Sequence, residues 1–581
     1  MYIFGLNIGH NATACLLKDG KILGCVSEER FSRIKNHSGI PFKSINYLLD
    51  SNKISMADID LLVLDNYYSI DKDPYFGKRF LSDYTEKPFK KRILSNLGYK
   101  FPNLFKMYAS LKKRFSNNDR HLSSLRLELS KSLNFPANKI LLVDHHLAHA
   151  YSACFNIAKN EKTLVFTLDG EGSGAFATIS IFDGKNLRTI SRSPKSASLG
   201  YFYAITTIML GMKPLEHEFK VMGLAPYAKA HNIEKVYPKL KNLFWIDKNL
   251  VFHSRFNMPF ADHFFKKEFD FTRFDFIAGA VQKLTEELTC EWIKKSIKKT
   301  GIRNIALSGG VFMNVKANQA ISELPEVEKM FVMPSCGDEC NAIGCCFYGY
   351  KKYCDKTSSE FNPKPIEGLY LGPEYDEDYV KNLIREKSLG ESYIIKKIKD
   401  INSEIAKLLA KGNIVARCTG RSEWGARALG NRSILANPSH PDTVRILNEA
   451  IKDRDFWMPF TPSILSTAAQ KYFLNPKKIF APYMIITFKS TPLAQKHLPA
   501  AMHPYDFTLR PQVVTKEYNS DYFDIISKFQ KLTGIGGVLN TSFNLHGEPN
   551  VLTPEDALHT VENSSLKYLA MGDYLFEKLF K

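Results

Sequence analysis

The chain opens with short apolar runs separated by turn residues. These runs predict three strands over Tyr2–Ile8, Ala12–Leu17 and Lys21–Val26. The turn Lys18-Asp19-Gly20 joins the last two as a hairpin. Pro41–Asp50 has the pattern of a helix, and Ile59–Leu64 that of a buried strand. A hairpin followed by a strand–helix–strand connection predicts a sheet that is only partly antiparallel.

Further strands recur along the first two thirds of the chain. They are predicted over Ile140–Val143, Leu164–Leu168, Ala175–Ile181 and Ile305–Leu307. Strands that alternate with helices are typical of the α/β class, which is the fold class that we predict.

A change of composition divides the chain into two predicted domains. Lys356–Glu367 combines Ser, Thr, Glu and Asn with Pro363 and Pro365, as linkers do, and a globular pattern restarts at Leu369. We therefore predict a first domain over residues 1–355, a linker over 356–367 and a second domain over 368–581. No run of 18 apolar residues and no signal peptide is evident, and the ten cysteines have no paired spacing, so we expect a cytoplasmic protein with reduced thiols.

The net charge of +19 is concentrated in one stretch. Between Lys87 and Lys139 thirteen Lys and Arg face only Asp119 and Glu128, which leaves a local charge of +11. Such a stretch suits nucleic acid, an anionic membrane surface or a phosphorylated ligand, and a solvated helical face is an equally good interpretation.

A histidine motif stands where a predicted strand meets a helix of small residues. In Asp144-His145-His146-Leu147-Ala148-His149, two of the histidines are four residues apart and share one helical face. His145 and His149 on one face are half of a metal site, whereas His146 points elsewhere. The alternative is a helix start with three solvated histidines.

Two acidic turns are candidates to complete this site. Asp169 follows a strand and is succeeded by Gly170 and Gly172, and Asp338 opens a helix. Glycines allow backbone amides to approach a phosphate closely, and two His with two Asp would leave open positions on a metal. Cys336 and Cys340 lack a second cysteine pair at zinc-site spacing, so packing is the favoured interpretation for them.

A third turn, Ser308-Gly309-Gly310 followed by Asn314, fits a nucleotide or phosphate cradle at a helix start. The second domain adds a dense set of cations and amides among glycines, as a triphosphate together with another phosphate would require. The set consists of Arg421, Arg427, Arg432, Lys452, Arg454, His503, Arg510, Asn540, Ser542 and His546. The residues Asp506, Thr508, Arg510 and Gln512 alternate as on one face of a strand.

Taken together, these motifs resemble those of a known enzyme family. With Gly9-His10-Asn11-Ala12, the stretch Ser27–Lys35 and Lys220–Tyr227, the chain resembles the O-carbamoyltransferases that decorate nodulation factors, tobramycin and cephamycins (the NodU, TobZ and CmcH group). The resemblance runs essentially end to end. It implies an N-terminal domain of actin and sugar-kinase type, like that of the tRNA threonylcarbamoyladenosine synthases, and a YrdC-like C-terminal domain.

The resemblance also implies a chemistry and a set of roles. The YrdC-like domain converts carbamoyl phosphate and ATP into carbamoyl adenylate, and the first domain passes the carbamoyl group to a hydroxyl of a small molecule or saccharide. The implied metal is a divalent ion, Fe(II) in the best match, with Mn, Zn and Mg also compatible. The implied metal ligands are His145, His149, Asp169 and Asp338. The residues implied to bind carbamoyl phosphate and ATP are Arg421, Arg427, Lys452, Arg454, Arg510, Asn540 and Ser542. The residues implied to bind the adenylate in the first domain are Gly170, Gly172, Gly309, Gly310 and Asn314. The residues implied to bind the acceptor are His10, Lys35, Gly200 and Lys220. The implied catalytic residues are His10, Lys35, Lys452 and Arg510.

The sequence departs from the family at one acceptor position and leaves rival functions open. Many relatives carry an Asp directly after the His of the first motif, where this chain has Asn11. A tRNA-modifying enzyme built from the same fold types is one alternative, and the net charge favours it. A hydrogenase-maturation carbamoyltransferase lacks support because its paired CxxC segments are missing. A non-catalytic binding module is a third alternative. We expect no nucleic-acid partner, and a homodimer remains open.

Overall fold

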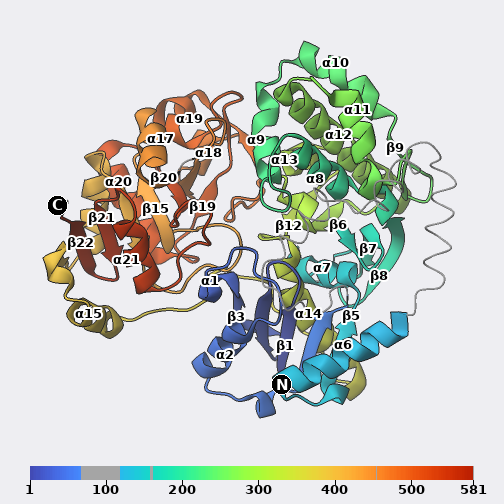
Figure 1. Cartoon of the computed structure of the whole chain (residues 1–581), viewed down its shortest axis with the longest axis horizontal. Helices are drawn as coiled ribbons and strands as arrows, with labels where there is room; N and C mark the ends of the chain where they lie inside the picture. The colour runs from blue at the N-terminus through green and yellow to red at the C-terminus, as the bar shows by residue number, and fades with distance from the viewer. Residues whose placement is uncertain (67–117, 158–160, 453, 580–581) are drawn as a thin grey trace. The chain divides into compact units, whose positions relative to one another are not determined.

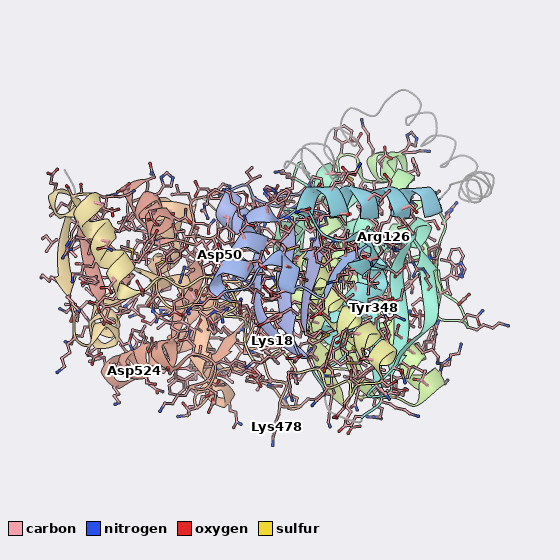
Figure 2. The ribbon with its side chains drawn as sticks, turned by 90° about the horizontal axis from the view of Figure 1, so that it is seen from below. Lys18, Asp50, Arg126, Tyr348, Lys478 and Asp524 are labelled. Carbon is pink, nitrogen blue, oxygen red and sulfur yellow. The ribbon has the colours of Figure 1, made fainter. Side chains whose placement is uncertain are left out.

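The computed structural model describes residues 1–66, 118–157, 161–452 and 454–579 (Figure 1). The chain forms two compact units. Unit 1 contains residues 1–28 and 36–366, and unit 2 contains residues 29–35 and 367–581. Most of the basic stretch 87–139, with Lys112, Lys113 and Arg114, lies outside the described residues. Arg126, near its end, is exposed on helix α6 (Asn118–Leu133) (Figure 2).

Unit 1 contains two five-stranded sheets with the same strand order. The first sheet runs β3 (Lys21–Ser27), β2 (Thr13–Lys18), β1 (Tyr2–Asn7), β4 (Leu61–Asp65), β5 (Ile140–Val143). The second runs β8 (Leu187–Pro194), β7 (Ala175–Phe182), β6 (Thr163–Gly172), β11 (Asn304–Ser308), β12 (Lys329–Val332). In each sheet three consecutive strands form an antiparallel meander. The first of these three also pairs with a fourth strand, and the fourth pairs with a fifth, both in parallel. The predicted strands and the mixed α/β class are therefore confirmed.

Helices of unit 1 pack around these sheets, and β9 (Phe244–Ile246) pairs with β10 (Phe252–Ser254). The helices are α2 (Phe42–Ser51), α6 (Asn118–Leu133), α7 (His145–Ala153), α8 (Leu199–Met209), α9 (Glu218–Leu224), α10 (Ala230–Lys241), α11 (Asp262–Phe269), α12 (Phe274–Thr300), α13 (Val315–Ser322) and α14 (Asn341–Thr357). None of the helices in the described part of the chain is long and apolar enough to cross a membrane.

Helix α14 is held close to both β1 and α7 by small residues. A Cβ atom on Gly344 would lie 1.8 Å from the carbonyl oxygen of Ala148, and one on Gly5 would lie 1.9 Å from that of Ala342. Because neither glycine can accept a side chain, the backbones approach closely. This packing brings the start of α14 beside the histidines of α7.

Unit 2 is built on an eight-stranded sheet. Its order is β13 (Tyr393–Lys397), β22 (Tyr574–Lys578), β21 (Tyr568–Met571), β14 (Val415–Cys418), β15 (Arg432–Ala436), β20 (Gly537–Ser542), β16 (Thr461–Leu465), β19 (Gln512–Val514). The helices are α1 (Glu29–Ser32), α15 (Glu377–Glu386), α16 (Ile401–Ala410), α17 (Asp442–Leu447), α18 (Ala469–Tyr472), α19 (Pro492–His497), α20 (Ser520–Thr533) and α21 (Pro554–Glu562). The core includes Ala416, Ile434, Leu539, Leu569 and Phe576 from the central strands and β22.

One predicted strand of unit 2 is wrong. The alternation of Asp506, Thr508, Arg510 and Gln512 does not lie on one strand, because β18 (Thr508–Leu509) pairs with β17 (Phe488–Lys489) while β19 belongs to the large sheet. Pro511 stands between the two and lacks the N–H that a continuous ladder needs.

Candidate functional site

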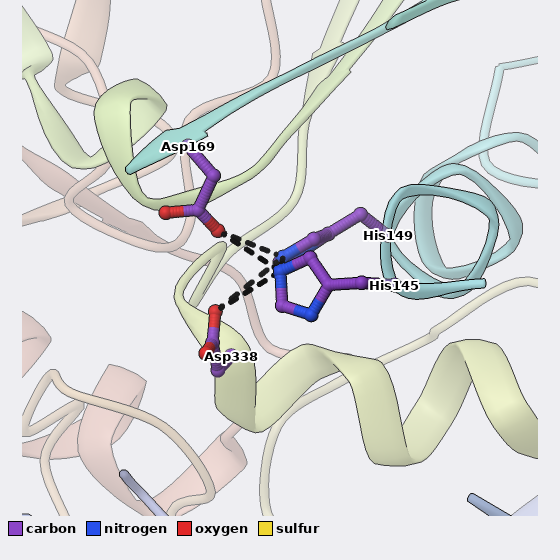
Figure 3. Close-up of side chains that lie close together, drawn as sticks. All are labelled: His145, His149, Asp169 and Asp338. Atoms are coloured by element: carbon purple, nitrogen blue, oxygen red, sulfur yellow. Dashed lines mark hydrogen bonds and ion pairs between the residues drawn. The ribbon is translucent and has the colours of Figure 1, made fainter. Parts of the chain in front are cut away.

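Two histidines and two aspartates of unit 1 converge on one point (Figure 3). His145 and His149 lie one turn apart on α7, whose first turn is capped by the Asp144 side chain accepting from the Leu147 amide. Asp169 lies where the register of β6 and β7 shifts, and Asp338 opens the short helix η7 (Asp338–Cys340) before α14. Side chains more than a hundred residues apart in sequence are thus brought together, as the motifs predicted.

The distances within this group fit a shared cation. The Nε2 atoms of His145 and His149 are 3.2 Å apart. Oδ2 of Asp169 lies 3.0 Å from Nε2 of His149 and 3.5 Å from that of His145. Oδ1 of Asp338 lies 3.5 and 3.7 Å from the same two nitrogens. One ligand atom from each residue lies within 4.8 Å of all the others.

The remaining ring nitrogens are engaged on the side away from this point. Nδ1 of His145 lies 3.3 Å from Oδ2 of Asp65 and 3.3 Å from Nδ2 of Asn341. Nδ1 of His149 lies 3.2 Å from Sγ of Cys340 and 3.3 Å from the Ser308 hydroxyl. Histidines that bind metals typically use one nitrogen for the metal and fix the ring through the other. The buried thiol of Cys340 therefore supports His149 from outside the group.

The electrostatics of the group also favour a positive charge at its centre. Burial by itself lowers the pKa of His145, but Asp338 and Asp65 outweigh it and raise that pKa to about 10. Burial likewise opposes a charge on His149, yet Cys340 and the carboxylates of Asp169 and Asp338 raise its pKa. The carboxylates thus favour positive charge between them, and a divalent cation would supply it while leaving both imidazoles neutral. The four residues fit a metal ion.

His146 has a different role, as predicted. Its Nδ1 lies 2.8 Å from the Thr167 hydroxyl. Burial, and then repulsion from His145 and His149, lowers its pKa to about 3. His146 is therefore a neutral core histidine.

Two of the predicted cradle glycines lie directly beside His145 and Asp169, and a third lies against Leu168. A Cβ on Gly172 would lie 1.9 Å from Cδ2 of His145, and one on Gly310 would lie 3.0 Å from Oδ1 of Asp169. Gly309, with φ of +102°, would place a Cβ 2.5 Å from the Leu168 carbonyl oxygen. A larger residue at these positions would displace the site.

The other predicted positions of unit 1 differ in their surroundings. A Cβ on Gly170 would meet nothing within 4 Å, whereas one on Gly200 would lie 2.6 Å from the Gly170 Cα. Asn314 caps α13 by accepting from the Ala317 amide, and Gln282 bonds to its side chain. Lys220 lies on α9.

His10 and Asn11 lie near the outer oxygens of the acidic turn. Nδ1 of His10 is 3.5 Å from Oδ2 of Asp338. Nδ2 of Asn11 donates to Oε2 of Glu339 at 3.2 Å. The sequence reasoning missed Glu339 and also Glu218, a carboxyl of α9 whose pKa burial raises to about 7 and on which His10 acts electrostatically. Glu218 stands two residues before the Lys220–Tyr227 motif, so its position was a usable signal.

Unit 2 gathers a separate set of cations. Lys452 ends the π-turn η9 (Asn448–Lys452), and its Nζ donates to Oδ1 of Asn544 at 3.0 Å and to Oγ of Ser542 at 3.3 Å. Burial, followed by repulsion from Arg454 and Lys35, holds the pKa of Lys452 well below its usual range. Lys35, which belongs to unit 2, therefore lowers the pKa of Lys452 through its charge.

Repulsion between the arginines of the set lowers the pKa of Arg454 and of Arg510. Burial and Arg427 lower the pKa of Arg454 to about 10. Burial, Arg427 and Arg454 hold the pKa of Arg510 well below its usual range. Arg454 also donates to Oγ1 of Thr541 at 3.1 Å and lies over the Phe460 ring. Cations that raise one another's energy in this way favour a bound polyanion.

Two further predicted residues of unit 2, Arg421 and Asn540, make hydrogen bonds within the unit. Arg421 donates to the carbonyl oxygens of Gly372 at 3.1 Å and Leu371 at 2.8 Å, which ties its loop to the start of the unit. Asn540 donates to the Ala428 carbonyl, the Ser463 hydroxyl and the Gln512 side chain within the buried sheet.

Comparison with known proteins defines the class of this fold and site. Residues 2–347 match the family described as Carbamoyltransferase N-terminus, and residues 406–578 match Carbamoyltransferase C-terminus. The chain belongs to the carbamoyltransferase family, and it is an enzyme of carbamoyl transfer. The resemblance noted from the motifs is thereby confirmed.

Relatives match over nearly the whole chain. Nodulation protein NolNO of Sinorhizobium fredii is 29% identical over 98% of this chain and 79% of its own length. An uncharacterised protein of Methanocaldococcus jannaschii is 30% identical over 99% of this chain and 100% of its own. Nodulation protein U of Sinorhizobium fredii is 24% identical over 94% of both chains.

Solved structures give weaker likenesses. Full-length HypF in its phosphate- and nucleotide-bound form is 14% identical over 62% of this chain and 56% of its own, with a TM-score of 0.36. At that score the likeness carries no argument about this chain.

Proposed function

We propose that the protein is an ATP-dependent O-carbamoyltransferase that works through carbamoyl adenylate, with one half-reaction in each unit. The observation that carries this proposal is the gathering of the buried cations Lys452, Arg454 and Arg510 in unit 2, where the charge of Arg454 lowers the pKa of the other two. A site of that kind stabilises a triphosphate with a second phosphate, which are the substrates that such an activation needs.

The activation in unit 2 is written as two balanced steps. Water cleaves carbamoyl phosphate to carbamate and inorganic phosphate. A carbamate oxygen then attacks the α-phosphorus of ATP, the bond to the β-phosphate oxygen breaks, and pyrophosphate leaves. Lys452, Arg454 and Arg510 bind the phosphate oxygens and offset the charge that develops on them.

The transfer is proposed for unit 1. The acceptor hydroxyl attacks the carbamoyl carbon, AMP leaves, and the hydroxyl proton passes to a base. His145, His149, Asp169 and Asp338 would hold a divalent metal, which when bound acts as a Lewis acid toward phosphate oxygen. His10, which lies beside Asp338, would contact the acceptor hydroxyl, and the backbone amides at Gly170, Gly309 and Gly310 would bind the adenylate phosphate.

Finer assignments of fold and cofactor follow the same proposal. The repeated strand order of the two sheets in unit 1 supports the actin and sugar-kinase type. Unit 2 is proposed to be YrdC-like and to contain the site where carbamoyl adenylate forms. The metal is proposed to be Fe(II). The acceptor is proposed to be a hydroxyl-bearing small molecule or saccharide.

The test is a product assay with purified protein. Carbamoyl phosphate labelled with ¹³C, ATP and a panel of hydroxyl acceptors are incubated together, and mass spectrometry follows acceptors, AMP and pyrophosphate. We expect one carbamoyl group on an acceptor and equal amounts of AMP and pyrophosphate. Formation of ADP in place of AMP, or transfer without ATP, would refute the adenylate route.

A further inference from the structure

A short segment from the first half of the chain is part of unit 2. Strand β3 ends at Ser27 in unit 1, residues 29–35 belong to unit 2, and the chain returns to unit 1 at Asn36. With the connection at 366–367, the polypeptide passes between the units three times. A single linker would suffice to join two domains, so the contacts of this excursion are informative.

Arg33 fastens this segment to the loop between β20 and α21. Its guanidinium donates to the carbonyl oxygens of Asn550 at 2.8 Å and Pro549 at 2.9 Å. It also lies 3.4 Å from Oε2 of Glu548 and 3.7 Å from Oδ1 of Asp556. The planar fork of arginine makes all these contacts at once, which an ammonium group does not reproduce.

The loop that Arg33 holds leads directly to the phosphate-binding lysine. Asn544 donates to the Glu548 carbonyl oxygen at 3.0 Å. Oδ1 of the same Asn544 accepts from Nζ of Lys452 at 3.0 Å and from the Ser542 hydroxyl at 2.6 Å. Two hydrogen-bonding steps therefore connect the 548–550 loop to the ammonium group of Lys452.

Arg30 reaches the second loop that carries cations. Only 5% of Arg30 is exposed, and its guanidinium donates to the Gly425 carbonyl oxygen at 2.8 Å. Gly425 has φ of +95° and stands two residues before Arg427, so this contact fixes a turn that favours glycine. Lys35, at the end of the segment, adds its own charge beside Lys452.

We propose that residues 29–35 are a built-in part of the anion site of unit 2, and that Arg33 is a positioning residue that orders the 548–550 loop and through Asn544 sets the ammonium group of Lys452. The inference rests on the proposed function, because it concerns how carbamoyl phosphate and ATP are bound. It assigns to the N-terminal half of the chain a role in activation, in addition to transfer.

The test compares full-length Arg33→Ala with wild type and with Arg385→Ala, which removes an exposed arginine of the same unit. The measurements are carbamoyl phosphate-dependent exchange of labelled pyrophosphate into ATP, and transfer from supplied carbamoyl adenylate. Loss of hydrogen bonds from a charged group commonly costs about tenfold or more, so we expect the KM for carbamoyl phosphate in the exchange to rise about tenfold in Arg33→Ala. Transfer from supplied carbamoyl adenylate should stay at its wild-type value, thermal unfolding should show that Arg33→Ala remains folded at the assay temperature, and Arg385→Ala should match wild type throughout.

A second variant and a rescue separate positioning from general damage. Arg33→Lys keeps the charge but not the fork, so its KM should lie between those of wild type and Arg33→Ala. Millimolar guanidinium should lower the KM of Arg33→Ala and leave that of Arg385→Ala unchanged. An unchanged KM in Arg33→Ala, or equal losses in exchange and transfer, overturns the inference. Absence of exchange in wild type would instead refute the proposed function.

Discussion

The carboxylate of Asp65, at the end of β4, lies 3.3 Å from Nδ1 of His145, on the side of the ring opposite to Nε2. Asn341 donates to the same carboxylate at 3.2 Å. This arrangement favours the tautomer with the proton on Nδ1 and a lone pair on Nε2, as a metal ligand requires.

We predict that Asp65→Asn weakens metal binding about ten- to a hundredfold while all four ligands remain. The loss follows because an amide no longer accepts strongly from the imidazole. Competition with a chromophoric chelator measures the affinity. Asp60→Asn, which removes a carboxylate just before the same strand, is the control. Unaltered affinity in Asp65→Asn would mean that Asp65 does not orient His145.

Removal of both histidines should separate the two half-reactions. In His145→Ala with His149→Ala, we expect metal content to fall from about one ion per chain to near zero and transfer to be lost. Carbamoyl phosphate-dependent pyrophosphate exchange should persist, because the cation set belongs to unit 2. Elemental analysis and the two activity assays are the measurements, with His231→Ala, an exposed position of unit 1, as the control. Equal loss of both half-reactions in a folded variant would contradict the assignment.

Substitution of the cations of unit 2 should impair activation and spare transfer. Lys452→Ala and Arg510→Ala should each reduce pyrophosphate exchange by about tenfold to about a hundredfold, since each would remove a charged contact to the desolvated phosphate in the proposed site. Transfer from supplied carbamoyl adenylate should continue. Lys471→Ala, an exposed lysine of the same unit, controls for a general change of charge. Wild-type exchange in either variant would exclude that residue from the site.

The residues expected to meet in unit 1 were found from local signals. His145 and Asp338 each open a helix, and Asp169 stands at the register shift between β6 and β7. Such ends and irregularities of elements are where side chains and amides are presented to ligands, and His149 follows one helical turn after His145. Asp65 was missed, although an Asp that ends a predicted buried strand is a signal of the same kind. The pairing of β4 with β5 sets Asp65 beside Val143 and so brings it near His145, which the local sequence does not reveal.

Other features depended on tertiary structure. No repeat is visible in the sequence, yet the two sheets of unit 1 share one strand order, because burial and connection geometry set that order and many residues satisfy them. The pattern of residues 29–35 predicts only local structure and does not say which unit the segment joins. The alternation around Arg510 suggested one strand, and the break at Pro511 shows that periodicity without a complete donor ladder is insufficient.

Glu218 provides a prediction on pH. Burial raises its pKa from 4.5 to about 7, while Oε1 accepts from the Leu215 amide at 2.7 Å. Between these two values the folded protein binds more protons than the unfolded chain, so stability falls as pH rises through the interval. The penalty is nearly absent below pH 4.5 and complete above pH 7. Glutamine has the shape of the protonated acid and keeps an oxygen for Leu215, so Glu218→Gln should be insensitive to this titration.

We therefore expect Glu218→Gln to gain about 2 kcal/mol in the free energy of unfolding, relative to wild type, when the pH is raised from 5 to 8. Urea unfolding of wild type and variant at both values is the measurement. Glu291→Gln, at an exposed position of α12 where Glu pairs with Lys295, should show no gain of this kind because its carboxyl is solvated. If the difference between Glu218→Gln and wild type stays constant from pH 5 to 8, the Glu218 carboxyl is ionised throughout. The charge of His10 would then outweigh the burial of Glu218.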